Sequence, residues 1–150
     1  MGSFSVGRTS MKNWNAFFIK MARLYATQSR CERLQVGAVI VRDRRVLSGG
    51  FNEAPSGFDH CKGESICNPN RTGCQRTIHA EENAIINAAR HGISIQHGTM
   101  YCTHLPCPSC FGKIINSGIS MVFYAEEYRR SEAIIMGRKA GVSVIKLEVK

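Results

Sequence analysis

Apolar residues recur along the chain at two spacings, one typical of helices and the other of strands. Between residues 13 and 28 they lie three or four positions apart, which predicts an amphipathic helix. Residues 35–41 and 45–50 form two apolar runs with a short turn between them, which predicts a strand pair. The remaining patterns predict helices at 78–91, 105–118 and 130–140, and strands at 99–103, 120–125 and 142–148.

This order of elements, α-β-β-α-β-α-β-α-β, predicts an α/β fold in which helices cover both faces of a mixed sheet. We expect one domain over residues 13–150, preceded by a flexible leader at 1–12. The segment 51–76 has no sustained period, and a loop this long in a small domain is usually functional or held by a bound group.

Composition narrows the classes of function. The chain has 150 residues, 43% of them hydrophobic, and no apolar run long enough to cross a membrane, which indicates a globular and cytoplasmic protein. Its formal charge of +9 favours an anionic ligand. Because the basic residues are scattered, a nucleotide is a better candidate than a nucleic-acid polymer.

Cysteine usage points to a metal. The seven cysteines are an odd number in a chain without a secretion signal, so disulfides are a poor interpretation. Cys107 and Cys110 form a C-x-x-C pair at an expected helix start, where they would share one face of the first turn. Alone, this pair is as consistent with small buried residues as with metal ligands.

His79 changes that balance. Thr77 is the expected N-cap of its helix, with His79 at the second helical position and the acids Glu81 and Glu82 in the first turn. One imidazole and two thiolates leave a fourth tetrahedral position open, as in catalytic zinc sites. Glu81 is then the expected proton carrier, whereas Glu82 is expected to be an ordinary surface acid. His79-x-Glu81 with Pro106-Cys107-x-x-Cys110 reproduces the signature of zinc nucleobase deaminases.

From about Trp14 onward the chain resembles deoxycytidylate (dCMP) deaminases of the cytidine deaminase superfamily. The segments that carry the resemblance are 29–31 with 36–40, 50–57, 77–85, 105–110 and 118–119. The resemblance implies an α/β/α sandwich around a five-stranded sheet, and hydrolysis of dCMP to dUMP and ammonia for thymidylate synthesis. It also implies that Asn52 holds the sugar, that the backbone near Ala80 and Leu105 holds the base edge, and that Tyr124 packs on the base. A turn asparagine and a core tyrosine are the alternatives.

The resemblance further implies a hexamer that dCTP activates and dTTP inhibits. The expected effector residues are Asn52, Glu53, Gly57 and Arg90. Phe51 and Glu53 stand where relatives have Tyr and Gly, and a carboxylate beside a triphosphate needs a Mg²⁺ ion or an arginine to offset its charge. Arg90 could instead be a solvated charge at its helix end.

Some relatives carry a second, structural zinc, so the resemblance also implies a possible second zinc site here. Its candidate ligands here are Cys31, Cys61, Cys67 and Cys74, with His60 able to replace one thiol. Their irregular spacing is equally consistent with free buried thiols. Arg30 and Arg71 are candidates for binding the 5′-phosphate of the substrate.

Two other functions stay open at this point. A tRNA adenosine deaminase or a single-strand DNA cytosine deaminase would need a basic, aromatic-lined channel, which the sequence does not indicate. A zinc-stabilised binding module without catalysis would tolerate replacement of Glu81 by glutamine, whereas a deaminase would not.

Overall fold

The computed structural model describes residues 12–60, 76–128 and 132–149, which contain four helices and five strands. The helices are α1 (Trp14–Ala26), α2 (Ala80–Arg90), α3 (Pro108–Asn116) and α4 (Glu132–Ala140). The strands are β1 (Gly37–Arg42), β2 (Arg45–Phe51), β3 (Thr99–His104), β4 (Met121–Glu126) and β5 (Ser143–Lys146). Type and order agree with the sequence prediction. The expected leader lies outside the described residues except for Lys12.

The strands form one mixed sheet in the order β2-β1-β3-β4-β5. β1 runs antiparallel to both β2 and β3, whereas β3, β4 and β5 are parallel to one another. The tight turn at Asp43 and Arg44 suffices to join β1 to β2, and the parallel strands are connected through α3 and α4. The five-stranded mixed sheet expected from the resemblance is therefore confirmed.

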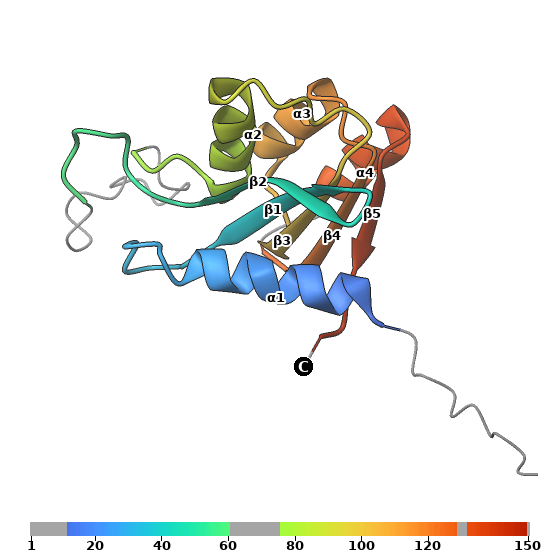
Figure 1. Ribbon diagram of the computed structural model, residues 1–150, viewed down its shortest axis with the longest axis horizontal. Coiled ribbons are helices and arrows are strands. Elements are labelled where there is room, and N and C mark those ends of the chain that lie inside the picture. Colours follow the sequence, from blue (N-terminus) through green and yellow to red (C-terminus); the bar gives the residue numbers. More distant parts are fainter. Residues whose placement is uncertain (1–11, 61–75, 129–131, 150) are drawn as a thin grey trace, which may run out of the picture.

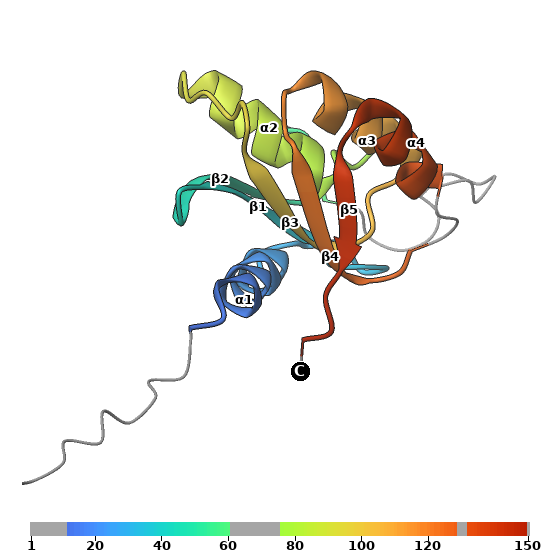
Figure 2. The ribbon, with the colours of Figure 1, turned by 90° about the vertical axis from the view of Figure 1, so that its right-hand side faces the viewer.

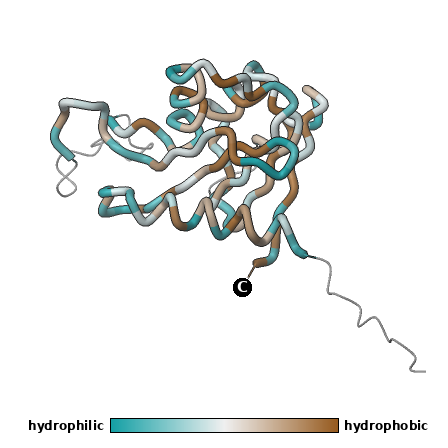
Figure 3. Tube along the Cα trace, viewed as in Figure 1, coloured by the Kyte–Doolittle hydropathy of each residue, from teal (hydrophilic) through white to brown (hydrophobic). Residues whose placement is uncertain are grey.

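Helices cover both faces of the sheet, as Figures 1 and 2 show. α1 lies along one face, where Phe18, Ile19 and Ala22 pack against Val39 and Tyr101. α2, α3 and α4 lie on the other face, and their apolar side chains form the larger core cluster with β1, β3 and β4. Apolar residues accordingly run along the central strands and alternate with polar ones along α1 (Figure 3). The expected three-layer α/β/α sandwich is confirmed.

None of the described helices combines the length and the apolar character that crossing a membrane requires.

α2 lies unusually close to β2 because Gly50 has no side chain. A Cβ atom at Gly50 would be 2.5 Å from the carbonyl oxygen of Ala80 and 2.5 Å from the amide nitrogen of Ala84. The side chain of Asn83 donates a 2.8 Å hydrogen bond to the carbonyl of Phe51 across the same contact. This packing fixes the start of α2 beside the end of β2, where the candidate site begins.

Candidate active site

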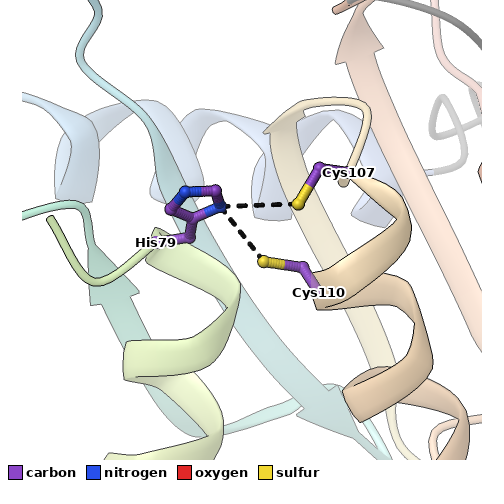
Figure 4. A group of neighbouring side chains, drawn as sticks. All are labelled: His79, Cys107 and Cys110. Carbon is purple, nitrogen blue, oxygen red and sulfur yellow. Dashed lines mark hydrogen bonds between the residues drawn. The ribbon is translucent and has the colours of Figure 1, made fainter. Parts of the chain in front are cut away.

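Three side chains with metal-binding atoms meet where α2 and α3 begin (Figure 4). The Nδ1 atom of His79 lies 3.6 Å from the sulfur of Cys107 and 3.2 Å from that of Cys110. All three ligand atoms lie within 4.8 Å of one another. Ordinary zinc–nitrogen and zinc–sulfur bonds in a tetrahedron place such atoms about 3.6 Å apart, so the spacing fits zinc.

The helix starts differ from the sequence prediction in a way that serves the site. Thr77 is not the N-cap of α2; His79 occupies that position and makes no capping hydrogen bond with its side chain. The reason is a short antiparallel bridge, in which Ile78 and Glu53 exchange backbone hydrogen bonds of 2.9 and 3.2 Å. This bridge holds the chain extended through His79, so the helix begins two residues later than predicted and the imidazole stays available for other contacts.

Cys107 occupies the equivalent position in α3. It is the N-cap of α3, in an extended conformation and without a side-chain capping bond. Pro108 follows at the first helical position, which its fixed φ angle and missing N–H favour. Cys110 then lies in the first turn, as the C-x-x-C spacing predicted. Two helix starts, each with positive partial charge, therefore face the thiol groups and favour their ionised form.

Hydrogen bonds among the three side chains shift their pKa values. Hydrogen bonds from Cys110 and His79 lower the pKa of Cys107 to about 4. The same contact with Cys107 raises the pKa of the Cys110 thiol. The hydrogen bond between His79 and Cys107 also raises the pKa of His79, to about 9. A zinc ion takes two thiolates and a neutral imidazole, so it would displace the remaining protons and have its charge neutralised by the sulfurs.

Two glutamates in the first turn of α2 have different surroundings. Glu81 is only 4% exposed, and burial raises the pKa of its carboxyl to about 7, within the range of an acid that exchanges protons near neutrality. Glu82 is not the ordinary surface acid expected. Its Oε1 atom accepts a 2.7 Å ion-pair hydrogen bond from Lys113 of α3 and lies 3.5 Å from the sulfur of Cys110. Glu82 thus joins the two helices that carry the cluster.

The cluster opens into a pocket of about 1110 Å³. Its walls come from the ends of β2, β3 and β4, the starts of α2 and α3, and the segment before β1. Of the predicted substrate-binding residues, Asn52, Ala80 and Leu105 line it, as do His79, Glu81 and Cys107. The sequence prediction missed several lining residues with polar or aromatic side chains, among them Arg33, His104 and Tyr128.

Tyr124 is not among the residues that line the pocket, so its expected place against the base stays a prediction. It is 4% exposed and belongs to the larger core cluster, paired in register with Cys102 of β3. Tyr124 lies inside β4, whereas the pocket lies beyond the carboxyl ends of the parallel strands. Tyr128, just past the end of β4, lines the pocket instead, with its ring edge-on to that of His104 at 6.3 Å. The rule that ligands bind outside the carboxyl ends of parallel strands pointed to this residue.

Asn52 lines the pocket and also clamps the segment before β1. Its Oδ1 atom accepts a hydrogen bond from the amide of Val36, and its Nδ2 atom donates to the carbonyl of Leu34, both at 2.8 Å. Ser29 adds a third link by donating to the carbonyl of Asn52 at 2.8 Å. The expected contact of Asn52 with the sugar remains a prediction. What the structure shows is that Asn52 holds the segment before β1 in place.

The expected effector residues are not gathered in one place within the chain. Glu53 forms the backbone bridge to Ile78, just before α2. Arg90 ends that helix, ten residues beyond its start and therefore about 15 Å along its axis. Gly57 adopts a φ of 88° in the loop after β2, with open space around it.

Most of the candidate ligands for the expected second zinc lie outside the described residues. Cys61, Cys67 and Cys74 fall in 61–75, as does Arg71. Cys31 lines the active pocket, and Arg30 contacts the ring of His60. Arg30 is not among the lining residues of the pocket.

Comparisons with known proteins agree with this geometry. Residues 12–126 match the family model described as the cytidine and deoxycytidylate deaminase zinc-binding region. ComE operon protein 2 of Bacillus subtilis is 41% identical over 138 residues, which cover 91% of this chain and 72% of that protein. The deoxycytidylate deaminase of Saccharomyces cerevisiae is 38% identical over 138 residues, which cover 88% of this chain but only 44% of the yeast protein.

A solved structure gives the same result at the level of the fold. The dCMP deaminase of cyanophage S-TIM5, in complex with dCMP and dUMP, superposes with a TM-score of 0.79 and 34% identity. The match covers 87% of this chain and 94% of the phage chain. With its zinc-ligand cluster at two helix starts and a family match over most of its length, the chain belongs to the cytidine and deoxycytidylate deaminase family.

Proposed function

We propose that the protein is a zinc-dependent hydrolase that converts dCMP and water to dUMP and ammonia. The observation that carries the proposal is the His79, Cys107 and Cys110 cluster with the buried Glu81 beside it, at a pocket that His79, Glu81 and Cys107 line. Relatives named deoxycytidylate deaminase, and a neighbour crystallised with dCMP and dUMP, support this choice of substrate.

The residues at the cluster would divide the work as follows. His79, Cys107 and Cys110 would hold zinc, which lowers the pKa of a coordinated water toward neutrality. Glu81 would take a proton from the attacking water and deliver it to N3 of cytosine. It would then carry a second proton to the amine that leaves C4. Burial suits Glu81 to both steps, because a carboxyl with a pKa of about 7 gains and loses protons readily.

Backbone and side-chain groups around the pocket would orient the nucleotide. The amide of Leu105 already donates to the carbonyl of Glu126 at 2.9 Å, so Leu105 offers the base its carbonyl as an acceptor for the exocyclic amine. Ala80, at the first helical position of α2, has an amide without a helical partner and can donate to the base. Arg33 is the one arginine or lysine among the described residues that line the pocket, and we assign it the 5′-phosphate in place of Arg30.

Regulation and assembly also belong to the proposal. We expect a hexamer in the cytoplasm that dCTP activates and dTTP inhibits, with Mg²⁺ offsetting the charge of Glu53 beside a triphosphate. Since Arg90 and Glu53 lie at opposite ends of α2, an effector that contacts both would have to extend along that helix or lie between subunits. A second zinc on Cys31 and its partner thiols would hold the loop after β2. Metal content per chain, sedimentation velocity and dCMP turnover with added dTTP test these points.

Replacement of Glu81 by glutamine tests the central claim. The variant keeps the shape of the side chain but cannot carry a proton, so turnover of dCMP should fall at least about 100-fold while zinc content stays at one or more per chain. Glu132→Gln is the matched control, because Glu132 also lies in the first turn of a helix but is exposed and outside the pocket. Full activity of Glu81→Gln would contradict the proposal and favour a zinc-stabilised binding module.

Ammonia release from dCMP, dCTP, cytidine and a tRNA, measured side by side on the zinc-loaded protein, tests the substrate. We expect turnover of dCMP well above that of the other three. Ammonia from tRNA alone would replace this proposal with the nucleic-acid deaminase.

A further inference from the structure

A chain of two hydrogen bonds runs from the start of β1 to the ring of His104 at the end of β3. The amide of Gly37 donates to the hydroxyl oxygen of Thr103 at 3.1 Å. That same oxygen lies 2.8 Å from Nδ1 of His104. Thr103 is 4% exposed, so its hydroxyl hydrogen has to find an acceptor within the protein.

The protonation state of His104 follows from this arrangement. A hydroxyl that accepts from a backbone amide has its own hydrogen left to donate, and Nδ1 of His104 is the acceptor within reach. Nδ1 must therefore carry a lone pair, and the proton of the neutral ring must be on Nε2. An imidazolium would offer a second donor to Thr103 and leave the hydroxyl hydrogen unpaired. Burial, which lowers the pKa of His104, favours the same neutral form.

The Nε2–H group lies on the side of the ring away from Thr103, and His104 lines the pocket. Among the residues that the structure describes, Thr103 is the hydrogen-bond partner of this ring, and Tyr128 meets it edge-on. Four carboxyl groups, those of Glu81, Glu82, Glu126 and Glu127, line the same pocket. A bound nucleotide would bring many acceptor oxygens into this pocket and would need hydrogen-bond donors from its wall. The Nε2–H group of His104 is such a donor.

We propose that His104, held by Thr103 as the neutral Nε2–H tautomer, donates a hydrogen bond to an oxygen of the bound nucleotide. The inference rests on the proposed function, since it requires a nucleotide in this pocket. The acceptor is a carbonyl oxygen of the base or an oxygen of the 5′-phosphate, and both are recognised by the same donor. Thr103 is a positioning residue, which acts on the substrate through His104.

Two substitutions of His104 separate the donor from the rest of the ring. In His104→Gln the side-chain amide nitrogen can reach the place of Nε2, whereas in His104→Asn it reaches only the place of Nδ1. We expect KM for dCMP to rise roughly 3- to 10-fold in His104→Asn, with kcat little changed, and to stay within about 2-fold in His104→Gln. Deoxycytidine, assayed in parallel, identifies the acceptor: an equal rise in KM indicates the base, and a rise for dCMP alone indicates the phosphate.

Thr103 provides the second pair of variants. Thr103→Val keeps the shape but has no hydroxyl, whereas Thr103→Ser keeps the hydroxyl. With the ring nitrogens labelled with ¹⁵N, NMR should find His104 protonated on Nε2 at neutral pH in the wild type and in Thr103→Ser. A mixture of tautomers, with a higher KM for dCMP, is expected in Thr103→Val. A purely structural role of Thr103 would lower the melting temperature without changing the tautomer.

Three results distinguish failure of this inference from failure of the proposed function. Protonation of His104 on Nδ1 in the wild type would overturn the inference directly. Equal KM values for His104→Asn and His104→Gln, in an enzyme that turns over dCMP, would overturn it and leave the proposed function standing. A zinc-loaded wild type that neither binds nor deaminates dCMP would overturn both.

Discussion

Replacement of Asn52 by alanine should weaken both the fold and substrate binding. The substitution removes the acceptor for the amide of Val36 and the donor to the carbonyl of Leu34, each bound at 2.8 Å. An unpaired buried backbone group costs about 1–3 kcal/mol, and the partial exposure of residues 34 and 36 lets water restore part of it. We expect a loss of about 2 kcal/mol in the free energy of unfolding, or about 4–8 °C in melting temperature for a domain of this size.

The same variant should bind dCMP less tightly, because Leu34 and Val36 line the pocket and lose the clamp that holds them. Chemical denaturation and steady-state kinetics measure the two effects. Asn87→Ala is the matched control: its side-chain amide also donates to a backbone carbonyl, that of Gly49 at 3.0 Å, but it lies outside the pocket. It should cost about 1 kcal/mol and leave KM unchanged. An Asn52→Ala protein as stable as the wild type would refute the clamp and leave only the sugar contact.

Three further changes test other parts of the structure. Gly50→Ala should lower the free energy of unfolding, measured by urea titration, by about 3 kcal/mol, because its Cβ atom would lie 2.5 Å from the backbone of α2. Gly112→Ala is the control and should be neutral or stabilising, because Gly112 has open space around it. Removal of zinc by a chelator should lower the melting temperature by about 8–16 °C. This is the shift expected when a protein of this size loses a ligand present at about 1,000 times its Kd. An unchanged melting temperature would argue against a bound metal. Lys113→Met should cost at most about 1 kcal/mol, since Lys113 is 49% exposed, and should cost less in a Glu82→Gln background if the ion pair is responsible.

Periodicity and motif spacing were sufficient to predict the layered fold and the metal cluster. Strong 3.6- and 2-residue patterns specify elements locally, and the spacing of Cys107 and Cys110 on one helix turn is itself a local property. The helix start near His79 was predicted two residues too early, because the bridge between Ile78 and Glu53 is a contact between distant segments. Cap preferences of single residues carry no information about such a contact.

Side-chain direction at the strand ends was harder to predict. Tyr124 and Tyr128 are both aromatic residues near the end of one strand, and only the register of β4 against β3 decides which of them is buried in the core. The role of Asn52 depended likewise on where the segment before β1 passes. His104 was missed because the role we propose for it depends on which residue contacts its Nδ1 atom, and the sequence does not reveal that contact.

His79 and Cys107 occupy the two positions at which a helix is normally closed by a side chain hydrogen-bonded to its free amides, and neither forms that bond. The first turns of α2 and α3 therefore lack the side-chain cap that commonly secures a helix start, and one metal ion bound to both N-cap residues would hold both turns. Metal binding and ordering of these two turns would then be coupled. Without the metal, the amides of these turns should exchange with solvent well before those of the sheet behind them.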